Sequence, residues 1–99
     1  MRVTAWSNGR NGYGVRVGAR SRDEHFDPAW DHIFVEIDGA EFRFSITPSF
    51  WRKCPEFRGR VLRDLFYRQG LAPWPKDAPP VFDLIPLGGG RFRLELDAS

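Results

Sequence analysis

The sequence has a single cysteine, Cys54, and this scarcity excludes a disulfide framework and a cysteine-rich zinc site. A reducing, cytoplasmic location is therefore expected. The apolar runs are only a few residues long, so neither a transmembrane helix nor a membrane partner is expected. Segment 1–6 lacks the continuous apolar stretch of a secretion signal.

Motifs that carry catalysis or bind cofactors are also lacking. Gly9, Gly12, Gly14 and Gly18 do not have the spacing of a dinucleotide-binding or phosphate-binding loop, and they precede a predicted strand where such loops precede a helix. The serines occur in no nucleophile-elbow pattern. The sequence therefore predicts no cofactor and no catalytic residue, and it favours a non-enzymatic protein.

Arginine and aromatic residues are abundant by contrast. Thirteen of the 15 basic residues are arginine, and the chain has nine Phe, four Trp and two Tyr. A length of 99 residues fits one domain, 1–99. Charge occurs in blocks, because 1–22 has five arginines and no acid, whereas 23–41 has seven acids and no Lys or Arg. Such blocks can neutralise each other across a sheet or leave a basic surface for a polyanion.

Alternating apolar residues and turn residues predict three β-hairpins. Asn-Gly dipeptides at 8–9 and 11–12 indicate the first turn, Asp38-Gly39 the second and Gly88–Gly90 the third. Segment 19–31 is expected to be a polar loop with one helical turn at 27–30. The strands are expected at 3–6, 13–17, 32–38, 41–46, 81–87 and 91–96.

One helix is predicted, at about residues 55–69. Pro55 suits its first turn, Gly70 suits a left-handed residue at its end, and an apolar stripe runs between them. The prediction is an α+β fold in the order ββ-ββ-α-ββ, an antiparallel sheet of about six strands in three hairpins with this helix on one face. The opposite face of the helix has the spacing of an ion-pair ladder, formed by Glu56, Arg60, Asp64 and Arg68.

Seven arginines are the candidate binding residues, because they have no acid in their own block or occupy polar positions of predicted strands. Those on strands are expected to share the sheet face that the helix leaves uncovered, which suits a protein partner or a polyanion. Most strand phenylalanines alternate to the core side, so stacking residues on that face are few. The seven are Arg10, Arg16, Arg20, Arg22, Arg43, Arg91 and Arg93.

Two features resemble parts of enzymes. The polar loop at 23–32 contains residue types that ligate metals or move protons, but their spacing matches no metal motif, and a capped surface loop is the other reading. Cys54, just before the predicted helix, is either an activated thiolate or a buried small hydrophobe. The candidate residues of the loop are His25, Asp27, Asp31 and His32.

Scattered positions along nearly the whole chain resemble a group of small single-domain bacterial proteins. The resemblance implies a stand-alone domain, of the kind carried on mobile or accessory DNA, with no assigned activity, and it implies no site residues. The matching positions are Trp6, Asn8-Gly9, Gly12-Tyr13-Gly14, Phe26, Trp30, Ser49-Phe50-Trp51, Cys54, Gly70-Leu71, Trp74-Pro75-Lys76, Pro79-Pro80 and Phe82.

Three functions remain open from the sequence. The first is a small binding module that engages a protein partner, or a second copy of itself in a homodimer, through a sheet face or edge. The alternative is nucleic-acid binding through the arginine-bearing face. The third is a metal-dependent hydrolase that uses the 23–32 loop.

Overall fold

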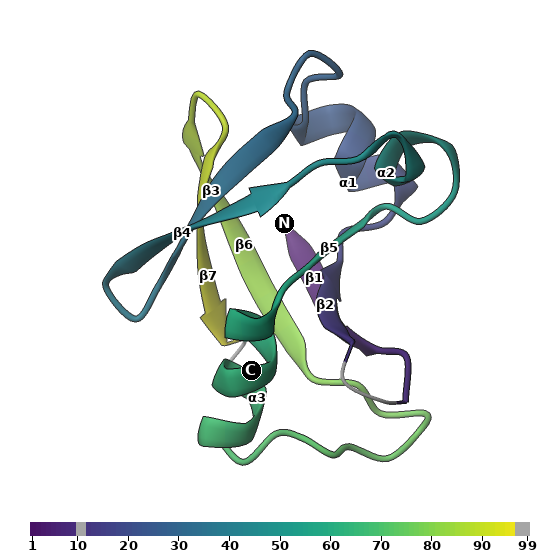
Figure 1. Cartoon of the computed structure of the whole chain (residues 1–99), viewed down its shortest axis with the longest axis vertical. Helices are drawn as coiled ribbons and strands as arrows, with labels where there is room; N and C mark the ends of the chain where they lie inside the picture. Colours follow the sequence, from purple (N-terminus) through teal and green to yellow (C-terminus); the bar gives the residue numbers. More distant parts are fainter. Residues whose placement is uncertain (10–11, 97–99) are drawn as a thin grey trace.

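The computed structural model describes residues 1–9 and 12–96 (Figure 1). This part of the chain contains seven strands and three helices. The predicted α+β class is confirmed. The strands are β1 (Arg2–Ser7), β2 (Tyr13–Arg16), β3 (His32–Ile37), β4 (Ala40–Ser45), β5 (Glu56–Arg58), β6 (Val81–Gly88) and β7 (Arg91–Leu96). The helices are α1 (Ala19–His25), α2 (Pro48–Arg52) and α3 (Arg60–Arg68).

The three predicted hairpins are present. β1 pairs with β2, β3 with β4 and β6 with β7, each pair antiparallel. At the β3–β4 turn, Asp38 and Gly39 have φ angles of 52° and 83°, the left-handed geometry that such a two-residue turn requires. Asn11 of the first predicted turn lies outside the described residues. Local turn chemistry at Asp38-Gly39 accounts for the pairing of β3 with β4.

The hairpins join into one mixed sheet with the strand order β4-β3-β7-β6-β1-β2-β5. β3 and β7 are parallel, so the prediction of an antiparallel sheet of about six strands is wrong in strand number and direction. The alternation within a strand specifies its buried face but not its neighbour. Neighbours depend on contacts between segments that are far apart in the chain.

The sheet curls until its two edge strands, β4 and β5, approach each other, which gives a nearly closed barrel (Figure 1). Across this gap the rings of Phe44 and Phe57 lie 5.0 Å apart between centroids. The inward side chains form one core, in which Val15, Ile33 and Val35 are fully buried. α3 lies toward one end of the molecule, and α1 and α2 lie toward the opposite end (Figure 1).

The predicted helix is shorter than expected. α3 begins only at Arg60, and residues 56–58 form β5, which pairs with β2. Phe57 is 1% exposed on this short strand, so burial of its ring inside the barrel outweighs its place on a helical stripe. Gly70 has a φ of 69°, which confirms the left-handed residue expected after the helix.

The predicted ion-pair ladder on this helix is wrong. Its first member, Glu56, lies on β5 and pairs with Arg16 of β2 at 3.4 Å. Its last member, Arg68, pairs with Asp38 of the β3–β4 turn at 3.0 Å. Arg60 therefore loses its assigned partner, and it forms no ion pair with any residue that the structure describes.

Two short helices, α1 and α2, were not predicted from the sequence. Residues Ala19–His25 form α1, although segment 19–31 was expected to be a polar loop. Every residue of α1 is at least partly exposed, so the helix has no apolar stripe for the sequence to show. α2 begins at Pro48 and buries Phe50. The turn predicted at 27–30 is present, since the Ala29 N–H donates to the Asp27 carboxylate at 2.8 Å.

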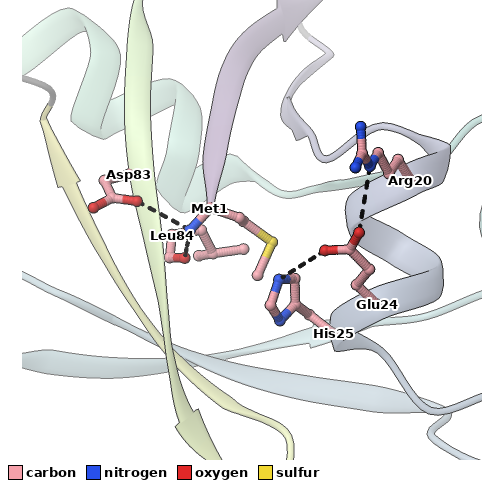
Figure 2. A network of polar contacts seen from close by, with 6 residues as sticks. All are labelled: Met1, Arg20, Glu24, His25, Asp83 and Leu84. Atoms are coloured by element: carbon pink, nitrogen blue, oxygen red, sulfur yellow. Dashed lines mark hydrogen bonds and ion pairs between the residues drawn. The ribbon is translucent and has the colours of Figure 1, made fainter.

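The amino group of Met1 joins the start of β1 to β6 (Figure 2). It donates to the main-chain oxygen of Leu84 at 2.8 Å and pairs with the carboxylate of Asp83 at 3.1 Å. The Leu84 N–H in turn donates to the Met1 oxygen at 2.8 Å. The Met1 side chain points toward α1 and packs against the core (Figure 2).

Candidate functional site

Arg91 and Arg93 of β7 are paired with acidic residues of β4 and β3. Arg91 lies 3.4 Å from the carboxylate of Glu41, and Arg93 donates to Glu36. Because β7 runs beside β3, these two arginines meet the acidic block at 23–41 across the sheet. Part of the arginine excess is therefore internal pairing.

Arg16 and Arg43 also lie beside acids, and they lie near opposite edges of the sheet. Arg16 pairs with Glu56 at 3.4 Å. The pKa of Asp31 is lowered chiefly by its hydrogen bond with His32, and the nearby charge of Arg43 contributes. The four arginines predicted on the sheet face thus form separate ion pairs and charge contacts, not one continuous cationic patch.

The other predicted arginines lie in α1 or before it. Arg20 pairs with a glutamate of the same helix at 3.3 Å (Figure 2). The side chain of Arg22 is only 14% exposed, and its Nη1 donates to the main-chain oxygens of Phe50 and Trp51 at 3.2 and 3.0 Å. The same guanidinium lies 5.3 Å from the Trp51 ring centroid, so it joins α1 to α2. Arg10 lies outside the described residues.

Replacing Arg22 by Lys is expected to lower the free energy of unfolding by about 1–2 kcal/mol. Lysine keeps the charge but lacks the planar guanidinium that binds two carbonyl oxygens while it stacks on Trp51. Urea denaturation measures the loss. The matched control is Arg20→Lys, for which a change within about 0.5 kcal/mol is expected, because the Arg20 side chain is 93% exposed. Equal losses in the two variants would contradict this role for Arg22.

The polar loop at 23–32 places its candidate residues in separate local contacts. Asp27 accepts a main-chain hydrogen bond in its turn, and His25 lies 3.7 Å from a glutamate of α1. His32 Nδ1 lies 2.6 Å from Asp31 Oδ1. Within residues 1–9 and 12–96, no three His, Cys, Asp or Glu side chains are grouped closely enough to hold a metal ion.

Cys54 is exposed between α2 and β5. The reading of this residue as a buried small hydrophobe is therefore wrong. Because α3 begins at Arg60, the thiol also lies away from the helix N-terminus at which the sequence placed it.

A group of arginines that the sequence did not single out surrounds a cavity of about 550 Å³ between β2, β5 and α3. Arg58 ends β5, while Arg60 and Arg63 occupy the first turn of α3. The cavity, called the arginine cavity below, is lined by Gly12, Tyr13, Arg58, Gly59, Arg60 and Arg63.

The arginine cavity is cationic. None of the described residues that line it is acidic. Arg58 and Arg60 form no ion pair within the described ranges, and Arg63 has only a distant one, 3.9 Å from Asp64. The Nε atom of Arg63 is buried without a hydrogen-bond partner in the described structure. Three guanidinium groups therefore face one space with little compensating negative charge.

Aromatic rings hold two of these arginines. The guanidinium of Arg58 lies 5.7 Å from the ring centroid of Trp6 on β1. That of Arg63 lies 5.4 Å from the ring of Tyr67, one helical turn further along α3. Such contacts orient a guanidinium while leaving its N–H groups able to bind an anion.

A second cavity of about 430 Å³, called the aromatic cavity below, adjoins the first. Tyr13 lines both cavities. The hydroxyl groups of Tyr13 and Tyr67 lie 3.0 Å apart, and this hydrogen bond is the main cause that raises the pKa of Tyr13 above its usual value of about 10. The aromatic cavity is lined by Ser7, Gly9, Tyr13, Tyr67, Pro73, Trp74 and Lys76.

The arginine cavity was not predicted, because the helix was expected to begin at residue 55 and α3 begins at Arg60. With a helix from 55, Arg60 belongs to an ion-pair ladder and Arg58 faces another side of the same helix. The signal that could have revealed the site is the Arg-Gly-Arg run at 58–60, where a glycine interrupts the helical pattern between two unpaired arginines.

No family model, curated protein or solved structure matches this chain. The resemblance to small bacterial single-domain proteins therefore stays a prediction. Within the described residues, no helix is long and apolar enough to cross a membrane. The function is accordingly inferred from the cavities themselves.

Proposed function

We propose that the protein is a binding module for nucleic acid, and that it holds the phosphate backbone in the arginine cavity. The observation that carries this proposal is the convergence of Arg58, Arg60 and Arg63 on one cavity whose described lining residues include no acid. The predicted arginine face on the sheet contributes less, since its cations have acidic neighbours.

The chemistry of guanidinium favours phosphate as the ligand. Each planar guanidinium can donate two parallel hydrogen bonds to a phosphate, and these charge-assisted bonds are stronger than neutral ones. Three like charges around one space repel one another, so a multivalent anion stabilises the group when it binds. Contacts to the backbone supply most of the affinity of nucleic-acid binding, without reading sequence.

Binding of a protein partner through a sheet face or edge receives less support. The edge strands β4 and β5 approach each other, and β5 has three residues. In the described part of the chain, the exposed large apolar side chains are Tyr67, Leu87 and Leu96. An interface core usually needs a larger group of apolar and aromatic side chains.

The proposal predicts salt-dependent binding of an oligonucleotide that needs the arginine cavity. Fluorescence anisotropy with a labelled strand is measured over a salt series for the unmodified protein and for Arg58→Gln/Arg60→Gln. The double variant is expected to bind at least about tenfold more weakly at low salt, with a slope of log K against log salt reduced by about 1.4, since each lost phosphate contact removes about 0.7.

The matched control is Arg52→Gln/Arg68→Gln, which removes the same charge from exposed positions outside the cavity. It is expected to keep most of the affinity. Equal losses in the two double variants would show only non-specific attraction to a basic protein and would overturn the proposed site. Absence of binding by the unmodified protein at low salt would overturn the function.

A further inference from the structure

We propose that the bound nucleic acid is single-stranded and that one of its bases enters the aromatic cavity, where it stacks on Tyr67 and Trp74. This inference rests on the proposed function, because it assumes that the backbone lies in the arginine cavity. It adds the form of the ligand and a second group of contact residues.

The two cavities are joined through shared and adjacent residues. Tyr13 lines both of them. Arg63 lines the arginine cavity, and Tyr67, one turn later on α3, lines the aromatic cavity; the guanidinium lies 5.4 Å from the Tyr67 ring centroid. A phosphate beside Arg63 therefore has an aromatic wall next to it, at the place that an adjoining base would occupy.

The rings of the aromatic cavity are held by edge-to-face contacts. The ring centroid of Tyr13 lies 5.7 Å from that of Tyr67 and 5.9 Å from that of Trp74, and both pairs are T-shaped. Phe66 supports the group from the core, 5.7 Å from the Trp74 ring. Tyr67 is nevertheless 47% exposed, so part of its ring is available for stacking. Fixed aromatic rings with an exposed face are what proteins use to stack unpaired bases.

Polar groups in the same cavity suit the edge of a base. Ser7, Lys76 and the tyrosine hydroxyls contribute donors and acceptors to its lining. Its volume of about 430 Å³ is that of a small-molecule pocket, which accommodates a base. Paired bases in a duplex are stacked inside the helix and do not reach a lateral cavity, so the geometry favours a single strand.

The deciding experiment compares a natural single strand with an abasic strand that has the same number of phosphates, and with the corresponding duplex. The unmodified protein is titrated with a single-stranded oligonucleotide, made as DNA and as RNA, with an abasic strand of equal length and with the corresponding duplex. We expect at least one natural single strand to bind about tenfold more tightly than the abasic strand, as expected for one stacked base, and more tightly than the duplex.

Variants locate the base in the aromatic cavity. Tyr67→Leu is expected to bring the affinity for the natural strand close to that for the abasic strand, and Tyr67→Phe, which keeps the ring, is expected to lose less. Phe42→Leu is the matched control, because it removes a partly buried ring on β4 that does not line either cavity. Since the abasic comparison uses the unmodified protein, it decides the question even if a variant fails to fold.

The outcomes separate this inference from the function on which it rests. Equal, salt-dependent affinity for natural and abasic strands, or tighter binding of the duplex, would overturn the stacked base and leave nucleic-acid binding intact. A polyglutamate peptide of matched charge that binds as tightly as the strands would overturn both proposals. Loss of discrimination in Phe42→Leu as large as in Tyr67→Leu would overturn the assigned cavity.

Discussion

Phe66→Ala is expected to lower the free energy of unfolding by about 3–5 kcal/mol, the usual cost of truncating a fully buried phenylalanine. The Phe66 side chain is fully buried on α3. Its ring contacts Tyr13, Trp74 and Phe82, at centroid distances of 6.1, 5.7 and 5.5 Å. Removing the ring would leave a cavity where α3, β2, β6 and the segment around Trp74 meet.

Urea or thermal denaturation measures this loss. A small domain has a total stability of about 5–15 kcal/mol, so the variant is expected to be marginally folded. Leu87→Ala is the control, with an expected change within about 0.5 kcal/mol, because the Leu87 side chain is 48% exposed. A loss below about 1 kcal/mol for Phe66→Ala would contradict the packing of α3 described above.

Gly14→Ala is expected to cost about 3 kcal/mol of unfolding free energy, at the upper end for overpacking. A Cβ atom at Gly14 would lie 2.5 Å from the main-chain oxygen of Phe57 and 2.8 Å from the Cβ of Arg58. Both neighbours belong to β5, and the main chain cannot move away without disturbing the β2–β5 pairing. Because Arg58 lines the arginine cavity, the affinity for the oligonucleotide is expected to fall as well.

Gly70→Ala is the matched control for this substitution. Gly70 has a φ of 69°, and a Cβ there would meet nothing within 4 Å in the described structure. Its cost is therefore backbone strain alone, about 1–2 kcal/mol, with no loss of binding expected. A Gly14→Ala protein that unfolds at the same urea concentration as the unmodified chain would contradict the close approach of β2 and β5.

The local elements follow from the sequence because they depend on neighbouring residues. The Asp38-Gly39 turn specifies the β3–β4 hairpin, and alternation predicts the buried residues Ile33, Val35 and Ile37. Gly70 ends α3 as expected. Leu96 alternates with the same period as the buried Phe92 and Leu94, yet it is 49% exposed at the end of β7.

Long-range packing decides the rest of the fold. Residues 56–58 read as the first turn of a helix, yet they form β5, because Phe57 is buried against Phe44 when the sheet curls. The parallel pairing of β3 with β7 likewise arises between segments far apart in the chain. Patterns within a segment contain no information on these partners.

The sequence by itself thus determined the α+β class, the three hairpins, the end of the main helix and the arginine and aromatic content from which a binding site is made. Only the tertiary structure decided which arginines are neutralised and which converge. Arg91 and Arg93 are paired because the sheet places β7 near Glu41 of β4 and Glu36 of β3. Arg58 and Arg60 meet at one cavity because the chain passes from the end of β5 directly into α3. The physical reason is that a charge's partners are set by distance in space, which the order of residues does not specify.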